Sequence, residues 1–184
     1  MGKLLIFDPR IAGVSGDMIL GALLDIGGSE RVLAKLAEAI EREVDHVDEL
    51  KIEVRDVWKC GIKAKKLEVN LKQHLDHHHH ESAVDLREDM LRVAECIKIG
   101  EETLNKALKA LDLLIDAECS VHGVEREKAH FHELASADTI FDILGTMMLL
   151  EDLGFAETGS KIVSLPVAVG VGEIRMEHLS LIHI

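Results

Sequence analysis

Three histidines and several carboxylates lie close together in the sequence between His122 and Gly145. Imidazole nitrogens and carboxylate oxygens are donors that bind divalent metal ions. His130 and His132 are two residues apart, so in an extended segment both rings would point to the same side and could bind one ion. Glu133 follows directly and offers a third donor. This spacing predicts a metal site at the end of a strand.

Asp138 and Asp142 are four residues apart in the segment that follows. Apolar residues recur here at helical spacing, which predicts a helix with Ser136 as its N-cap. The helix dipole alone would favour Asp138 in the first turn, but it explains Asp142 less well because its effect fades after that turn. We interpret the two aspartates as the acidic face of the helix, with Gly145 leaving this face open. A carboxylate of this face is a candidate general base.

A second group of histidines is found in the passage HLDHHHHE. His77, His78, His79 and His80 lie between a predicted strand and a predicted helix, whereas an expression tag would stand at a terminus. A loop with so many imidazoles would capture nickel, copper or zinc ions, but it lacks the fixed geometry of a catalytic site. We therefore predict a histidine-rich loop that collects metal ions, and the loop alone does not select the metal.

The start of the chain combines a short apolar run with a glycine-containing loop. The run KLLIFD predicts a buried strand that ends on Asp8. The loop that follows contains Gly13, Ser15 and Gly16 and leads into a predicted helix. A loop and a helix N-terminus of this kind can bind an anion such as a substrate phosphate, and Asp8 and Asp17 would then need a metal between them and that phosphate. The alternative is a tight turn in which Ser15 caps the helix and Asp17 is a favourable first-turn acid.

Alternating strands and helices must position these residues. Period-two alternation and helical spacing predict strands at Lys51–Val57, Lys66–Leu71 and Lys161–Val169, and helices at Ser29–Val44, Ala83–Ile97 and Glu101–Cys119. Such an alternation is typical of an α/β fold, and we predict a layered sheet flanked by helices. The length of 184 residues suits a single domain spanning residues 1–184.

Composition narrows the classes of partner. The net charge of −13 argues against nucleic-acid binding, because a basic face could not outweigh that field near phosphates. No apolar run approaches the length of a membrane span. The three cysteines are far apart and form no C-x-x-C motif, which favours a reducing, cytoplasmic location. The sequence leaves open whether the chain forms a homo-oligomer.

Several passages together resemble one family. FDPRIAGVSGDMILGALLDIG, HFHELASADTIFDILG and SLPVAVGVG are similar to passages of the LarC family, the nickel-insertion proteins of nickel-pincer nucleotide cofactor biosynthesis. The resemblance implies a CTP-dependent cyclometallase that inserts nickel into pyridinium-3,5-bisthiocarboxylic acid mononucleotide, with CTP and Mg or Mn as cofactors. The product would serve lactate racemase. Family members continue beyond His178 with a nucleotide-binding domain, so the resemblance implies an N-terminal part without that C-terminal domain.

Three functions follow from these observations. In the first, the chain is the metal-handling part of a nickel inserter: the histidine-rich loop gathers nickel, His130 and His132 hold it together with Glu133 or the aspartates, and a carboxylate of Asp138 or Asp142 removes the ring proton. In the second, the chain stores or delivers nickel without catalysis. The third is a metal-dependent phosphohydrolase, which would use Asp8, Asp17, His130, His132 and Asp138.

Overall fold

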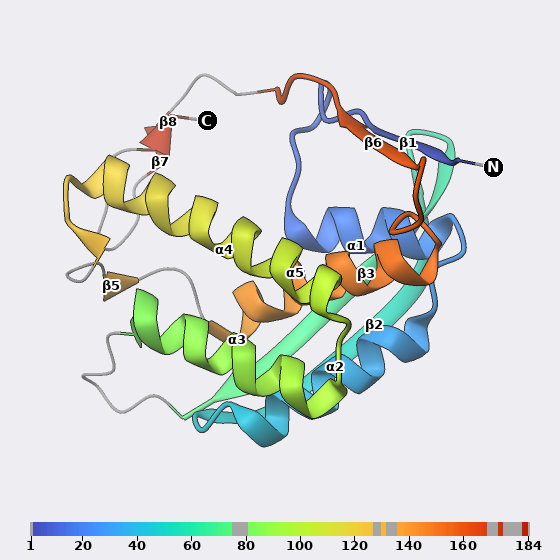
Figure 1. Ribbon diagram of the computed structural model, residues 1–184. Coiled ribbons are helices and arrows are strands. Elements are labelled where there is room, and N and C mark those ends of the chain that lie inside the picture. Colours follow the sequence, from blue (N-terminus) through green and yellow to red (C-terminus); the bar gives the residue numbers. More distant parts are fainter. Residues whose placement is uncertain are drawn as a thin grey trace. The chain divides into compact units, whose positions relative to one another are not determined.

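The computed structural model describes residues 2–74, 81–126, 130–131, 136–168, 173–174 and 182–183 (Figure 1). The chain divides into two compact units. The first unit joins Met1–Ser15 to Gly154–Ile184, and the second unit is Gly16–Leu153. The candidate residues Asp17, Asp138 and Asp142 all belong to the second unit.

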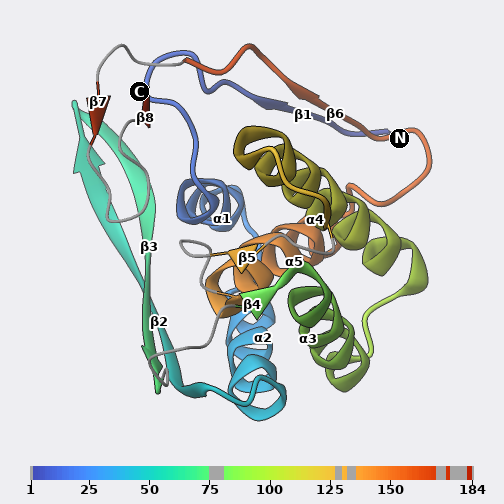
Figure 2. The ribbon, with the colours of Figure 1, turned by 90° about the vertical axis from the view of Figure 1, so that its left-hand side faces the viewer.

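The second unit packs α-helices against one side of a long β-hairpin (Figure 2). Its elements in chain order are α1 (Gly16–Asp25), α2 (Glu30–Glu43), β2 (Val47–Lys59), β3 (Ile62–Gln73), β4 (Glu81–Ser82), α3 (Ala83–Ile97), α4 (Glu101–His122), β5 (His130–Phe131) and α5 (Ser136–Asp152). Helix α1 packs on β3, and α2 packs on β2. Helix α5 contacts α1, α2, α3 and α4, so the helix that carries Asp138 and Asp142 is central to this unit.

Helix α5 is held by a buried apolar stripe. Ile140, Phe141 and Leu144 are fully buried, as is Leu149 further along the helix. Burying a side chain such as Phe or Ile contributes roughly 1.5–3 kcal/mol relative to leaving it in water. The helix predicted from apolar spacing is therefore confirmed, and the rigid packing of its inner side fixes where its acidic residues stand.

The expectation that Gly145 keeps the acidic face open is wrong. Gly145 is buried, and a Cβ atom at this position would lie 3.0 Å from Leu33, 3.1 Å from Leu20 and 3.5 Å from Leu36. Each of these distances ends on a leucine Cδ2 atom. The missing side chain at Gly145 lets α5 approach α1 and α2 closely, so this glycine serves helix packing.

Capping sets the boundaries of α3 and α4. The side chain of Ser82 accepts a hydrogen bond from the backbone N–H of Asp85 at 3.2 Å, and the Asp85 carboxylate accepts one from the Ser82 N–H at 3.1 Å. This capping box starts α3 where the sequence predicts it. Helix α4 runs beyond the predicted end at Cys119 to His122, where Gly123 ends it with a left-handed φ of 65°.

The hairpin β2–β3 is antiparallel and longer than the two strands predicted from alternation. Cys60 and Gly61 form its turn with φ of 50° and 81°. Two consecutive positive φ values are typical of the type I′ turn, whose twist matches that of the strands. Leu67 on β3 is buried on the helical side, whereas Trp58 near the turn is 70% exposed. Lys63, near the same turn, pairs with an acid, which agrees with a solvated hairpin end.

The first unit contains short strands. β1 (Leu4–Phe7) pairs in parallel with β6 (Lys161–Ser164), and β7 (Glu173–Ile174) pairs with β8 (Ile182–His183). The strand predicted in KLLIFD is present, but the expectation that it is buried is wrong, because Leu4 is 61% and Ile6 is 54% exposed. The sequence indicated an apolar strand but not what would cover it, and β1 has a single strand neighbour in the described part of the chain.

The mixture of helices and small sheets confirms the predicted α/β class. The strands of the described segments form two-stranded sheets. The predicted histidine-rich loop, His77 to His80, lies outside the described residues. The expectation of a single domain over residues 1–184 stays a prediction. None of the helices in the described ranges has both the length and the apolar character of a membrane span.

Candidate functional site

Helices α1 and α5 bring together three aspartates that are far apart in the sequence of the second unit. Asp17 stands in the first turn of α1. Asp138 stands in the first turn of α5, and Asp142 follows one helical turn later. Because the two helices pack on each other, Asp17 joins the pair on α5 closely enough for its charge to act on both. We call Asp17, Asp138 and Asp142 the aspartate cluster.

Because Gly16 has no side chain, the carboxylate of Asp142 can lie against the N-terminus of α1. A Cβ atom on Gly16 would lie 1.8 Å from Oδ2 and 2.0 Å from Cγ of Asp142, so the carboxylate occupies the space that a side chain would take. From the sequence, Gly16 was expected to belong to an anion-binding loop. In the structure its backbone lies against the carboxylate of Asp142, a contact that requires glycine.

The surroundings of Asp138 and Asp142 favour the protonated form of these two carboxyl groups. Desolvation, followed by the nearby charges of Asp138 and Asp17, raises the pKa of Asp142 from 3.8 to about 7. Desolvation and the charge of Asp17 also raise the pKa of Asp138. No basic side chain in the described part of the chain acts to lower either pKa. Asp142 can therefore take up and release a proton near neutral pH, as a general acid or base requires.

The remaining residues of the predicted anion site belong to the first unit. Asp8 forms hydrogen bonds at 2.7 Å to both Nε and Nη2 of Arg10, and the hydrogen bond from this guanidinium is the main cause that lowers the pKa of Asp8 to about 2. Gly13 has a φ of 72° and donates a hydrogen bond to the carbonyl of Pro9 at 3.1 Å. Ser15 is exposed. The binding of a substrate phosphate by these residues together with Gly16 and Asp17 stays a prediction.

Arg10, which was not among the predicted site residues, pairs with Asp8. Its guanidinium neutralises Asp8, so this carboxylate is not free to act alone on a metal ion. The sequence does contain a sign of this ion pair, because an arginine two residues after an aspartate in a turn is well placed to pair with it.

The backbone pairs the two residues Glu81 and Ser82 with the strand that carries His130. β4 and β5 are antiparallel, with Ser82 opposite His130 and Glu81 opposite Phe131. Glu81 directly follows the histidine run in the sequence, and Phe131 directly precedes His132. His130 therefore stands on a strand, as predicted from its spacing.

Most of the predicted metal ligands lie outside the described residues. His77 to His80, His132 and Glu133 lie outside the described residues, and for His130 only the backbone is described. Within the ranges that the structure describes, no three His, Cys, Asp or Glu side chains form a group that could hold a metal ion. The three aspartates therefore affect one another through their charges, and the metal site stays a prediction.

Comparison with known proteins defines the class of this chain. A family model described as nickel insertion protein matches residues 5–181. This range includes every candidate residue from Asp8 to Asp142. The chain belongs to the nickel insertion protein family, which confirms the resemblance found in its sequence.

Individual relatives give the comparison more detail. A protein of Methanothermobacter thermautotrophicus is 33% identical over 176 residues, which cover 94% of this chain and 40% of the relative. Proteins of Akkermansia muciniphila and Geobacillus kaustophilus are each 33% identical and are named pyridinium-3,5-bisthiocarboxylic acid mononucleotide nickel insertion protein. The alignments to these two cover 96% of this chain and 41% of each relative, so the chain spans about two fifths of their length. No solved structure matches this chain.

Proposed function

We propose that this chain is the part of a nickel insertion protein that handles the metal and supplies the base for nickel insertion. The substrate would be pyridinium-3,5-bisthiocarboxylic acid mononucleotide, the molecule in the names of two relatives. Family membership supports nickel as the metal. The structural observation that carries the proposal is the half-buried Asp142, whose pKa is raised to about 7 beside two other aspartates.

The proposed reaction needs a base because a nickel–carbon bond replaces a carbon–hydrogen bond of the pyridinium ring. As Ni(II) bonds to the ring carbon, the proton on that carbon must leave, and no change of oxidation state is required. A carboxylate with a pKa near 7 accepts a proton more readily than one with an ordinary pKa and is still half deprotonated at neutral pH. We assign the proton to a carboxylate oxygen of Asp142, from which it passes to water.

The aspartate cluster would also link the protonation state of Asp142 to the arrival of the metal ion. A nearby cation favours the charged form of a carboxylate. A nickel ion that approaches Asp17, Asp138 and Asp142 would therefore lower the pKa of Asp142 and leave it ready to accept the ring proton. Asp138 and Asp17 would serve this step through their charges.

The nickel cargo would reach this site through the predicted histidines. We propose that His77 to His80 gather nickel and that His130, His132 and Glu133 hold it, a role supported by the pairing of β4 with β5. CTP with Mg or Mn would be the cosubstrate, and the loop with Asp8 and Gly13 would face the substrate phosphate. The free cysteines Cys60, Cys96 and Cys119 support a reducing, cytoplasmic location.

A reconstituted reaction tests the proposal. The chain is incubated with Ni(II), CTP, Mg²⁺ and the pyridinium mononucleotide, and the nickel-containing nucleotide is measured by mass spectrometry. Asp142→Asn should slow product formation by roughly 10²–10⁴-fold, the usual contribution of a general base. Asp45→Asn, which changes an exposed aspartate after α2, is the matched control and should leave the rate unchanged.

The alternatives give different results in the same reaction. A chain that binds nickel but forms no product would be a storage or delivery module. Hydrolysis of a generic phosphoester that depends on added Mn(II) would indicate a phosphohydrolase, although the pairing of Asp8 with Arg10 counts against that use of Asp8. Full activity of Asp142→Asn would reject Asp142 as the base.

A further inference from the structure

The outer edge of strand β2, the edge that faces away from β3, is open over much of its length. In the described part of the chain β2 pairs with β3 alone, and the helices lie on one side of this hairpin (Figure 2). The turn at Cys60 and Gly61 has two residues, so Lys59 and Ile62, which flank it, form a hydrogen-bonded pair. Every second residue before Lys59 bonds to β3 in the same way. The N–H and C=O groups of the residues between them point to the outer edge.

One carboxylate covers the beginning of this edge. The backbone N–H of Leu50 donates a hydrogen bond to Oε1 of Glu41 at 2.6 Å, as expected for a group that points away from β3. By the same alternation the outward groups that follow belong to Ile52, Val54 and Asp56. Within the part of the chain that the structure describes, no hydrogen bond reaches the outward N–H groups of these three residues. A strand edge with unpaired N–H and C=O groups is a template for another strand.

The other edge of the hairpin is less suited to pairing. A Cβ atom on Gly21 of α1 would lie 2.8 Å from the backbone carbonyl oxygen of Lys65, so α1 lies against β3 at this point. Strand β3 also carries four lysines and one glutamate, and two copies of such a strand would repel each other. The edge of β2 is therefore the one that another chain can join.

The side of β2 away from the helices carries charges that alternate in sign. Glu49, Lys51, Glu53 and Arg55 stand at every second position and so share one side of the hairpin. Leu50, which points to the other side, is buried against the helices. The signs run minus, plus, minus, plus along the strand. An antiparallel copy of the strand presents them in reverse order, so it would set an opposite charge against each of the four.

We infer that β2 pairs with β2 of a second copy of this chain, in a two-fold antiparallel arrangement centred on Ile52. In this register Glu49 faces Arg55 of the second copy, and Lys51 faces Glu53 of the second copy. Two-fold symmetry makes each contact occur twice. A shift by two residues in either direction would instead set Glu53 opposite a glutamate and Lys51 opposite a basic residue. The two hairpins would form one sheet with the strand order β3–β2–β2–β3.

The backbone of β2 fits this register. Pairing centred on Ile52 joins even-numbered residues to even-numbered residues, and these are the residues whose N–H and C=O groups point outward. The N–H groups of Ile52 and Val54 would donate to the second copy, while Leu50 keeps its hydrogen bond to Glu41. Ile52 and Val54 are only half-buried on the helical side, and an added strand would cover more of both side chains.

Glu53 is the charge on this strand that gains most from a second copy. In the single chain Lys51 pairs with Glu49, and Arg55 pairs with Glu68. Among the described residues Glu53 has no ion pair, and the residue directly opposite it on β3 is Glu68. Like charges at opposite positions are unfavourable. Lys51 of the second copy would bring a positive charge to this place.

Analytical ultracentrifugation of the full chain, at increasing protein concentration and physiological salt, tests the inference. The salt screens the long-range repulsion between copies that each carry a net charge of −13. Lys51→Glu and Glu53→Lys each turn two attractive cross-strand pairs into repulsive ones, so each should raise the dimer Kd roughly tenfold. Glu38→Lys, an exposed charge change on α2, is the matched control and should leave the Kd unchanged.

A charge exchange provides a rescue that depends on the register. The double variant with Lys51→Glu and Glu53→Lys sets opposite charges against each other again and should recover most of the affinity between copies. All of these side chains are exposed, so the far-ultraviolet circular dichroism spectra of the variants should superimpose on that of the wild-type chain.

Hydrogen exchange examines the strand edge directly. The amides of Ile52 and Val54 should exchange more slowly as the protein concentration rises and the dimer forms. The amide of Leu50 should change little, because it is already bonded to Glu41. This contrast between neighbouring amides separates strand pairing from association through another surface.

Several results would overturn the inference. A chain that stays monomeric at millimolar concentration forms no such dimer. A dimer whose Kd is the same in both single variants, or whose double variant is no tighter than either single one, pairs through another surface. Slow exchange at Ile52 and Val54 in the dilute monomer would show that other residues of the same chain cover this edge. None of these measurements involves nickel, so the inference stands or falls independently of the proposed function.

Discussion

Replacement of Asp142 by asparagine should stabilise the chain at neutral pH. The pKa of Asp142 is raised from 3.8 to about 7 in the folded chain, so the folded state holds a proton that the unfolded state has already released between these two values. Stability therefore falls as the pH rises from about 4 to about 7, and the full penalty is present above that window. Asparagine carries no charge and removes this penalty.

The size of the effect follows from the shift. One pKa unit corresponds to about 1.36 kcal/mol, so the shift of Asp142 sets an upper limit of roughly 4 kcal/mol. Asp142 is only half-buried, and water screens part of its interaction with Asp138 and Asp17. After this discount we expect Asp142→Asn to raise the free energy of unfolding at pH 8 by about 1–2 kcal/mol, with little change at pH 4.5.

Urea unfolding at pH 4.5, 6 and 8, followed by far-ultraviolet circular dichroism, measures this difference. The carboxylates of Asp8 and Glu49 have lowered pKa values, and the stability that they contribute is lost as the pH falls below about 4.5; both chains share this loss, so it cancels in the difference. Histidine titration is common to the wild-type chain and the variant and cancels in the difference. Asp45→Asn is the control and should follow the wild-type curve. Parallel pH dependences for Asp142→Asn and the wild-type chain would refute the reasoning.

Three further predictions concern the packing around the aspartate cluster. Gly16→Ala should push the carboxylate of Asp142 toward water and return its pKa toward the usual range, as carbon-detected NMR titration would show, with a change in unfolding free energy below about 1 kcal/mol. Asp138→Asn should lower the pKa of Asp142 in the same titration, but not to 3.8, because desolvation is the larger cause. Gly145→Val should destabilise the chain by roughly 1–3 kcal/mol in urea, because the added carbons would meet Leu33 and its neighbours, and an unchanged midpoint would contradict that packing.

Local signals in the sequence were sufficient for most of the elements. Helix α3 has the predicted range Ala83–Ile97 because a capping box starts it, and α5 follows the apolar spacing that predicts it. The burial of β1 was mispredicted because apolar residues indicate a strand without indicating what lies on its faces. Gly145 was misinterpreted for a related reason, since the sequence does not show which helices lie against a glycine.

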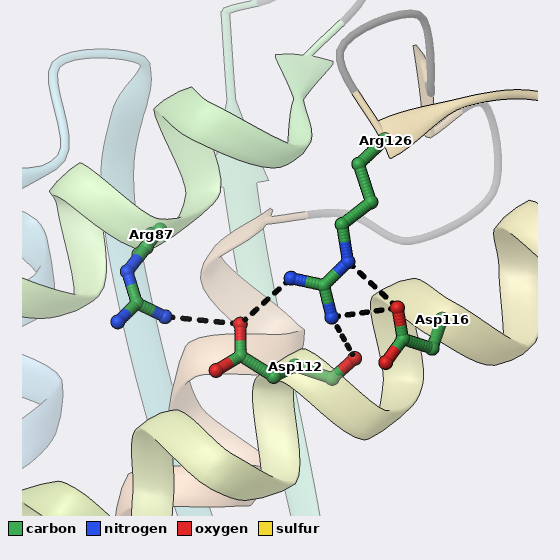
Figure 3. Close-up of polar contacts among 4 residues, drawn as sticks. All are labelled: Arg87, Asp112, Asp116 and Arg126. Atoms are coloured by element: carbon green, nitrogen blue, oxygen red, sulfur yellow. Dashed lines mark hydrogen bonds and ion pairs between the residues drawn. The ribbon is translucent and has the colours of Figure 1, made fainter.

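The candidate site was predictable as a set of residues but not as an arrangement. Asp17, Asp138 and Asp142 were identified from their types and spacing. The contact between Asp142 and Gly16 depends on the packing of α1 against α5, which no local pattern encodes. The hydrogen bonds of Arg126 to Asp112 and Asp116 could not be predicted either, because they form only after the chain turns at Gly123 (Figure 3).

The position of Trp58 determines which optical signal can follow this chain. It is the single tryptophan, the chain has no tyrosine, and the indole is 70% exposed near the hairpin turn. An indole already in water emits at nearly the same wavelength before and after unfolding, so intrinsic emission would barely register the loss of the helical core. The same exposure makes Trp58 a local reporter, because quenching or a blue shift of its emission would reveal any molecule that settles on the end of the hairpin.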